Sequence, residues 1–344
     1  MLASCEQEDP QVSFDPTPYP LNFGAFAAPN LPADNIPSVT GVQLGRMLFY
    51  EKRLSKDNSQ SCASCHKQMD GFSDERKFSI GIRGLEGRRQ AMPLFNLAWH
   101  QFGFFWDGRA PTLRDQALRP IQDTLEMNES LVNVVAKLKE DQKYKDQFIR
   151  AFGDDNITAD RIGLAIEQFE ITLISNRSKY DDYLAGKTQL TESEEKGRIL
   201  FFSEYNPDTG AKGGECFHCH VGNNFSMHTY LNNGLDSEAR FTDLGRYEIT
   251  GNEEQRARFK LPSLRNVALT APYMHDGRFQ TLEEVIEHYN SGVFYSGTLD
   301  ESMDHNLLPD GLQLSEQDKA DLVAFLKTLT DTEFINDERF SEPH

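Results

Sequence analysis

The chain contains 344 residues, of which 35 are basic and 54 are acidic, and its formal net charge is -19. This length suggests about two domains of roughly 150 residues each. The excess of negative charge argues against binding to nucleic acid, and no apolar run approaches the ~18 residues that a membrane-spanning helix requires. The composition therefore favours a globular protein of two domains.

The first forty residues form a proline-rich lead-in. Seven prolines, from Pro10 to Pro37, lack the N–H donors of regular structure and predict an extended tether over residues 1–39. Cys5 ends the string Leu2-Ala3-Ser4-Cys5, which resembles the processing box of bacterial lipoproteins, although the charged and apolar parts of a signal sequence do not precede it. We expect a lipid on Cys5 to be the only membrane contact; a chance match of four residues is the alternative.

The chain contains two Cys-x-x-Cys-His motifs, which hold four of its five cysteines: Cys62/Cys65/His66 and Cys216/Cys219/His220. Two thiols at this spacing can form thioether bonds to the vinyl groups of a haem, and the following histidine can ligate the iron. A dithiol redox pair has no use for that histidine, and a zinc site needs two more ligands near each pair. The motifs predict two covalently bound c-type haems, and attachment of such haems outside the cytoplasm indicates the periplasm.

Two amphipathic helical patterns follow the first motif, at about residues 129–152 and 158–175. The second pattern has apolar residues at helical spacing: Ile162, Ala165, Ile166, Phe169 and Leu173. The polar stretch 176–189 predicts a hinge. We therefore divide the chain into an N-terminal haem domain over residues 40–185 and a C-terminal haem domain over residues 186–344.

In the second domain, helices are predicted at about residues 191–202, 281–290 and 315–329. The first two open with Thr-x-x-Glu capping boxes, at Thr191/Glu194 and Thr281/Glu284. No long window shows the alternating pattern of a strand. The expected fold class is mostly α, with two cytochrome c-like haem domains and long loops.

The residue that faces each iron decides the function, because an open position lets peroxide bind whereas a strong sixth ligand makes an electron relay. In the helix predicted at 281–290, one stripe faces the core: Leu282, Val285, Ile286 and Tyr289. His288 falls on the charged side. Tyr289 therefore points inward, either as a packed aromatic or as a ligand. Other ligand candidates, which periodicity does not rank, are Met274, His275, Met303 and His305.

Four further motifs accompany the haem motifs: Gly45-Arg46-Met47-Leu48-Phe49, Phe105-Trp106-Asp107-Gly108-Arg109-Ala110, the run from Leu264 to Gly277, and Leu322-Val323-Ala324-Phe325-Leu326. With them the chain closely resembles the bacterial di-haem cytochrome c peroxidases, including their MauG-like branch, over roughly residues 41–329. In that family the N-terminal haem is the peroxide site and the C-terminal haem stores and passes electrons.

The resemblance implies roles for individual residues around the first haem. His66 would hold the peroxidatic iron, and Trp106 would lie between the haems and carry charge. Gln116 and Glu126 match the distal glutamine and glutamate of the family, and Pro120 matches the proline that shapes the distal pocket. A carboxylate at this place can take a proton from iron-bound peroxide and return it to the leaving oxygen.

Two positions separate the branches of the family. Many of these peroxidases have a histidine that blocks the peroxidatic iron until the other haem is reduced, and here that position is Ile82. Isoleucine cannot ligate iron, so we expect a five-coordinate first haem. The sixth ligand of the second haem is methionine in peroxidases and tyrosine in the MauG-like branch; here it is Tyr289. An anionic oxygen ligand favours Fe(III).

Three more positions follow from the resemblance. A calcium ion would bind between the haems to Gln90 and the carbonyls of Thr270 and Pro272, where oxygen ligands suit this ion; the family usually has asparagine in place of Gln90. The surface tryptophan through which MauG oxidises its partner is here Gly214. Trp99 is another candidate exit route for electrons.

The leading hypothesis is a di-haem peroxidase that reduces hydrogen peroxide to water with electrons from a cytochrome c or cupredoxin. The first alternative is a MauG-like oxidase that modifies a partner protein through high-valent iron; Ile82 and Tyr289 favour it and Gly214 disfavours it. The second alternative is a non-catalytic electron-transfer cytochrome with two six-coordinate irons. Family members are often homodimers, but no interface is readable from the sequence.

Overall fold

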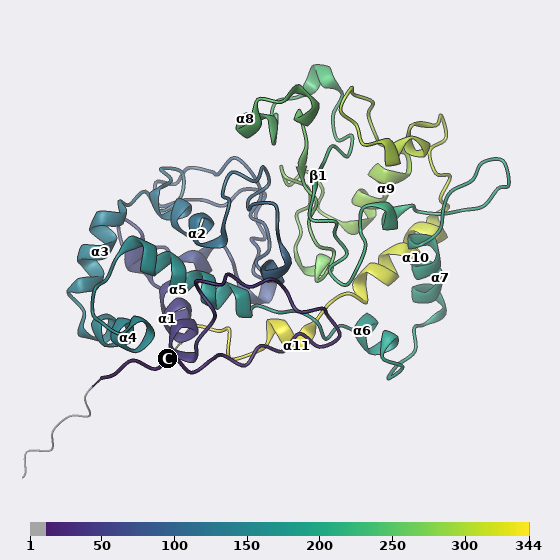
Figure 1. The fold of residues 1–344 in the computed structure, drawn as a ribbon. Helices are drawn as coiled ribbons and strands as arrows, with labels where there is room; N and C mark the ends of the chain where they lie inside the picture. The colour runs from purple at the N-terminus through teal and green to yellow at the C-terminus, as the bar shows by residue number, and fades with distance from the viewer. Residues whose placement is uncertain (1–11, 344) are drawn as a thin grey trace, which may run out of the picture.

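The computed structural model describes residues 12–343, so the predicted lipid anchor at Cys5 lies outside the described residues. The described chain is mostly helical, as predicted, and forms two units that lie side by side with long loops between their helices (Figure 1). No helix among residues 12–343 is both long enough and apolar enough to cross a membrane.

The N-terminal unit is built on α1 (Val39–Phe49), α2 (Leu113–Gln122), α3 (Leu131–Lys139), α4 (Gln142–Phe152) and α5 (Ala159–Thr172). Helix α5 is buried along most of its length and packs against α1 and α2. Gly45 of α1 permits the close approach, because a Cβ there would lie 1.9 Å from the carbonyl oxygen of Ala165. Leu44, Leu48 and Ile166 meet in the resulting core.

The prediction of a single helix at residues 129–152 is wrong in one respect. The structure has two helices there, α3 and α4. Asp141 lies at the break, where its side chain accepts a hydrogen bond from the backbone N–H of Lys143. An aspartate in this position caps a new helix and satisfies one of its free N–H groups. The amphipathic pattern continues through the break, which is why periodicity did not reveal it.

The C-terminal unit contains α6 (Lys179–Leu184), α7 (Glu192–Phe201), α8 (Tyr247–Thr250), α9 (Leu282–Ser291) and α10 (Glu316–Lys327). The predicted capping boxes of α7 and α9 are confirmed. Helices α7 and α10 pack closely, and their contact leads into a core with Phe201, Ile286 and Phe325. The short strands β1 (Tyr230–Leu231) and β2 (Phe259–Lys260) pair antiparallel, with Tyr230 opposite Lys260.

Both ends of the described chain lie against the N-terminal unit (Figure 1). In the segment predicted as a tether, the Asn35 side-chain amide donates a hydrogen bond to Glu167 of α5 at 2.7 Å. After α10 the chain returns as α11 (Thr332–Ile335), and Phe334 is fully buried in the aromatic core of the first unit. Residues 12–38 and 332–341 thus belong to the N-terminal unit. The boundaries of 40–185 predicted for this unit from the sequence leave them out.

Candidate haem sites

The two Cys-x-x-Cys-His motifs fold in the same way. Each begins with a short 3-10 helix, Cys62–Ser64 and Cys216–His218. His66 Nδ1 lies 2.9 Å from the carbonyl oxygen of Phe72, and His220 Nδ1 lies 2.8 Å from that of Phe225. A carbonyl at Nδ1 fixes the ring orientation and leaves Nε2 free to ligate a metal.

Burial keeps both histidines neutral, which is the form that binds iron. It lowers the pKa of His66 and lowers the pKa of His220 to about 4. None of the four cysteines of the motifs forms a disulfide, although the two members of each pair are only three residues apart. The sulfurs are therefore available for thioether bonds.

A cavity of about 370 Å³ lies next to the first motif and is lined by Cys65, His66 and Trp106. A smaller one of about 40 Å³ adjoins the same histidine and includes Cys62. The volume of the larger cavity is typical of cofactor pockets. The space, the free thiols and the open Nε2 of His66 together fit a c-type haem.

The residues predicted to lie on the distal side of the first haem come together around this space. Gln116, Pro120 and Glu126 line both cavities together with His66. Gln116 and Pro120 lie one turn apart on α2, and the proline ring leaves the Gln116 carbonyl without its usual helical donor. The loop after α2 turns back, since the Met127 N–H donates to the Pro120 carbonyl at 3.2 Å. This turn brings Glu126 beside the helix.

Glu126 and Gln116 have the properties of groups that handle protons. Burial raises the pKa of Glu126 to about 7, Asp123 adds to this shift, and Arg109 opposes it. A carboxyl group with this pKa can both take up and release a proton near neutral pH. The Oε1 atom of Gln116 is buried and has no protein partner, so it is available to accept a hydrogen bond from a ligand.

The loop that carries Ile82 lies directly against Glu126. The Ile82 N–H donates a hydrogen bond to the Glu126 carbonyl at 3.0 Å. A Cβ on Gly81 would lie 2.0 Å from the Leu125 carbonyl oxygen, so only glycine permits this approach. Ile82, which stands where many of these peroxidases have the blocking histidine, is therefore held beside Glu126.

Trp106 lies where the two units meet. Its indole N–H donates a hydrogen bond to the Gln90 carbonyl at 2.8 Å, and its ring packs with Phe259 of the second unit. The ring of His275 also lies at this boundary, at 6.5 Å from that of Trp106 and stacked on Phe259 at 3.6 Å. An aromatic path from the first cavity therefore leads into the second unit.

Tyr289 of α9 lies close to the second motif. Its hydroxyl oxygen accepts a hydrogen bond from the Asn233 side chain at 3.0 Å, and the same amide lies 3.5 Å from the sulfur of Met274. Burial raises the pKa of Tyr289 to about 12; Asn233 lowers it, and Cys219 and Cys216 add to the rise. Tyr289, Asn233 and Met274 thus form one group close to the thiols of the second motif.

The prediction for His288 is wrong. This residue is only 6% exposed, and its Nε2 lies 3.0 Å from the Asn233 carbonyl oxygen. The loop that contains Asn233 covers the side of α9 that periodicity assigned to solvent. Of the other ligand candidates, His305 lies 2.7 Å from a Glu215 oxygen.

Comparison with known proteins identifies the family. The model of the di-haem cytochrome c peroxidases matches residues 39–189. The methylamine utilization protein MauG of Methylophilus methylotrophus is 34% identical over 87% of this chain and 84% of its own length. Cytochrome c551 peroxidase of Nitrosomonas europaea is 37% identical over 89% of this chain and 86% of its own.

The chain belongs to the di-haem cytochrome c peroxidase family.

A solved structure supports the same fold. A MauG-like protein associated with microbial copper homeostasis superimposes with a TM-score of 0.83 and 36% identity, covering 92% of this chain and 97% of the other. The family name implies two haems, and its members include both peroxidases and MauG proteins. Membership alone therefore does not choose between these activities.

The calcium ligands predicted from the peroxidase family stay a prediction. Gln90 is buried, and its side-chain N–H groups point to Ser73 and the Asp74 carbonyl at 3.1 and 3.2 Å. Thr270 and Pro272 lie in the loop before Tyr273, on the other unit. An amide oxygen of Gln90 remains available for a cation.

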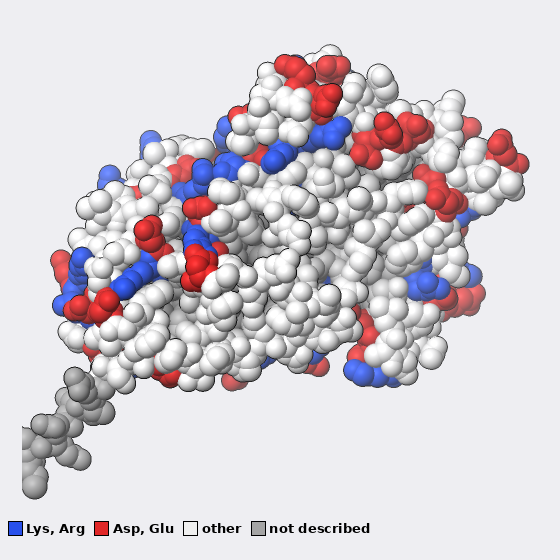
Figure 2. Space-filling view, in the orientation of Figure 1, with Lys and Arg blue, Asp and Glu red and all other residues white. Residues whose placement is uncertain are grey.

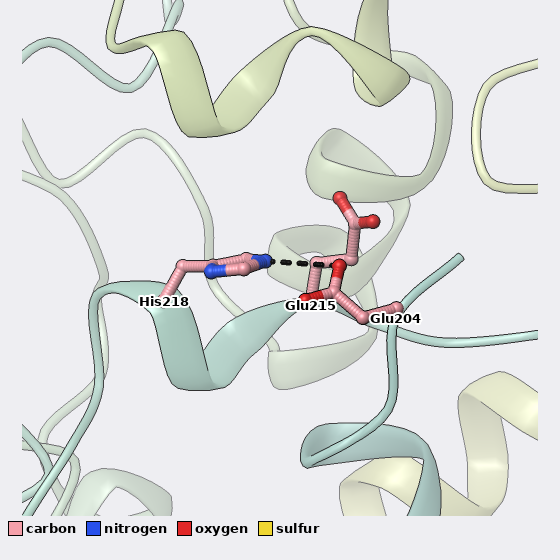
Figure 3. Close-up of side chains that lie close together, drawn as sticks. All are labelled: Glu204, Glu215 and His218. Atoms are coloured by element: carbon pink, nitrogen blue, oxygen red, sulfur yellow. Dashed lines mark hydrogen bonds and ion pairs between the residues drawn. The ribbon is translucent and has the colours of Figure 1, made fainter. Parts of the chain in front are cut away.

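One group of acidic and histidine side chains lies at the second motif and consists of Glu204, Glu215 and His218 (Figure 3). His218 Nε2 lies 3.2 Å from Glu204 Oε2, and Figure 3 shows these two side chains directed toward each other. The buried Glu215 accepts a hydrogen bond from the Tyr205 N–H at 3.0 Å and pairs with His305. Since Glu215 and His218 already have protein partners, the group is explained as a polar network that holds the motif.

Glu170 is a residue that sequence reasoning missed. It lies on α5, is 2% exposed and lines the smaller cavity with Cys62 and Glu126. Its Oε2 atom has no hydrogen-bond partner, and burial raises the pKa of its carboxyl group to about 8. The first haem site therefore contains a second buried acid, which helical periodicity could have marked only as a polar residue on an apolar face.

Proposed function

We propose that this protein reduces hydrogen peroxide to water at the first haem, with electrons that pass through the second haem. The observation that carries the proposal is the meeting of Gln116, Pro120 and Glu126 around the cavity that also contains His66. When bound, the haem supplies an iron atom that can hold peroxide and exchange electrons with it.

The side chains of the chain would manage the protons of this reaction. Glu126, with a pKa raised to about 7 by burial, accepts the proton of the bound peroxide and returns it to the leaving oxygen. The unpartnered Oε1 of Gln116 accepts a hydrogen bond from the remaining O–H and orients the molecule. Ile82 has no atom that could ligate iron, so this loop would not compete with peroxide when the haem is bound.

The remaining assignments belong to the same proposal. Cys62, Cys65, Cys216 and Cys219 would form the thioether bonds, and His66 and His220 would hold the two irons. Tyr289 would hold the second iron as well, which its position near the second pair of thiols supports. The electron donor is a small redox protein, a calcium ion binds near Gln90, and the protein acts in the periplasm, where a lipid on Cys5 would anchor it.

Stopped-flow mixing of the fully ferric protein with hydrogen peroxide tests the proposal. A rapid change in the haem spectrum without prior reduction is expected, followed by steady oxidation of reduced cytochrome c or cupredoxin. Absence of any spectral change would instead identify an electron-transfer cytochrome.

A second candidate function is the oxidation of a partner protein, as the name of the MauG relatives suggests. Ile82 and Tyr289 favour it. A large residue at position 214 would be crowded, because a Cβ there would lie 3.3 Å from Cys216 Sγ. Trp99 is another candidate exit route for electrons, and its ring packs edge to face with those of Phe23 and Phe26. Rapid reaction with peroxide but no turnover with either small redox protein would favour this function.

A further inference from the structure

Lys260 is a buried cation at the boundary between the two units. It belongs to β2, is 2% exposed, and its ammonium group donates a hydrogen bond to the carbonyl of Gly103 in the first unit. Its backbone N–H donates to the Trp106 carbonyl at 2.7 Å. Among residues 12–343 no carboxylate forms an ion pair with it. Burial of an ammonium group without a counter-charge is strongly unfavourable.

The groups around Lys260 do not supply that counter-charge. His100 and His228 lie beside each other with ring centroids 4.7 Å apart, and the Nδ1 atom of each is buried without a partner. Burial lowers the pKa of His228 to about 4 and holds that of His100 well below its usual range, so both are neutral. Arg246 adds positive charge and, with burial as the larger cause, lowers the pKa of Lys260 to about 8.

Asp107, one of the acids that line the same cavity, already has basic partners. Asp107 accepts hydrogen bonds from Arg89 and from Arg109 at 3.1 Å. Figure 2 shows basic side chains gathered along the border between the two units, although the whole chain is acidic. Acidic side chains also line the cavity, but among residues 12–343 none of them forms an ion pair with Lys260.

Lys260 and His100 line the same cavity of about 370 Å³ as His66. Both residues therefore lie in the wall of this cavity, where the ammonium group of Lys260 has no ion-pair partner and the Nδ1 atom of His100 has no hydrogen-bond partner. A haem carries two carboxylates on the side of the ring away from its two vinyl groups, and thioether bonds at Cys62 and Cys65 fix the vinyl side. The carboxylates must then lie in another part of the cavity.

We propose that Lys260 is the counter-charge for a propionate carboxylate of the first haem, with His100 beside it. The contact would tie the haem to both units, because Lys260 comes from the second unit and is bonded to Gly103 of the first. It would also hold a positive charge near the first iron and so favour its reduced form. This proposal requires the first haem but does not depend on peroxide chemistry.

The test uses holoprotein with Lys260→Gln, which removes the charge but can keep the hydrogen bond to Gly103. Lys260→Arg restores the charge, and Lys187→Gln is a matched control, because the Lys187 side chain is 71% exposed. Resonance Raman spectra of the ferric protein report the propionate bending bands, and spectroelectrochemistry reports the reduction potential of each haem. Both readouts are independent of turnover.

In Lys260→Gln we expect a shifted propionate band and a lower reduction potential at the first haem, with the second haem less affected. Lys260→Arg should keep the reduction potential close to that of the wild type, because the charge is retained, but should shift the propionate band, because the donor group changes. Lys187→Gln should change neither. Unchanged bands and potential in a folded Lys260→Gln protein with two haems would overturn the proposal. If that variant does not fold, a band in Lys260→Arg identical to that of the wild type would overturn it, since a direct contact must change with the donor group.

Discussion

Glu126 is the residue on which the peroxide reaction should depend most. Glu126→Gln keeps the size of the side chain but cannot accept a proton. We expect the rate of reaction with peroxide to fall about 10²–10⁴-fold. In the wild type the rate should rise as pH increases through about 7, because the raised pKa leaves less carboxylate below that value.

Stopped-flow rates between pH 5 and 9 check this prediction. The variant should lose the rise near pH 7, whereas Asp123→Asn, which leaves Glu126 in place, should retain it with a slightly lower midpoint, because Asp123 contributes to the raised pKa. An unchanged rate and pH profile in Glu126→Gln would show that the proton goes elsewhere.

Tyr289 gives a second prediction at this scale. Tyr289→Phe removes the hydroxyl oxygen that lies near the second pair of thiols, so the second haem should change its electron paramagnetic resonance signal and its reduction potential should rise. Tyr273→Phe is the matched control, since that hydroxyl donates to the Val267 carbonyl at 2.9 Å instead. Identical spectra of Tyr289→Phe and wild type would rule out the tyrosine as ligand.

At the level of residues, the sequence predicted those that belong to motifs and missed those that act through distant contacts. Gln116, Pro120 and Glu126 could be predicted to meet because the family resemblance aligned them. Asn233 could not, since it reaches Tyr289 across 56 positions from a loop without a motif. Glu170 was hidden for a different reason: a polar residue on a helix is usually exposed, and here packing against α1 and α2 buries it.

In the proposed function, the loop of residues 79–86 is the element that would leave the first iron open. Ile82→His would place an imidazole next to Glu126, to whose carbonyl the backbone of residue 82 is bonded. We expect a six-coordinate, low-spin first haem and a slower reaction with peroxide in the ferric state. Electron paramagnetic resonance measures the spin state, and Arg83→His, at an exposed neighbouring position, is the control. A wild type that is already low-spin at both irons would contradict the open first site.

Among the elements, α5, α7, α9 and α10 were predicted; α5 and α9 have an apolar stripe, and α7 and α9 open with a capping box. Helix α2 was not predicted, because its short sequence contains Pro120 and several charges. Pro120 lies in the last turn of this helix and removes one backbone hydrogen bond, the one that the Gln116 carbonyl would accept. The element that carries two distal residues was thus the one with the weakest local pattern.

At the scale of the molecule, α11 brings the chain back to the N-terminal unit, and this contact should contribute strongly to the free energy of unfolding. Phe334 is fully buried, and its ring lies 5.5 Å from that of Phe72, whose carbonyl holds His66. Phe334→Ala should lower the free energy of unfolding by about 3–5 kcal/mol. Thermal unfolding of the holoprotein measures this loss.

Tyr295→Ala, at a side chain that is 72% exposed, is the control and should change stability by less than about 0.5 kcal/mol. A small effect of Phe334→Ala would mean that α11 does not contribute to the core. The two haem units themselves followed from the repeated motif. The place of α11 did not, because contacts between chain ends depend on tertiary packing that no local pattern records.

The position of α11 has a consequence for biosynthesis. The chain emerges from the ribosome with its N-terminus first, yet the aromatic core behind His66 needs Phe334, which follows much later in the sequence. The unit that carries His66 therefore cannot be completed until the chain has been synthesised as far as Phe334.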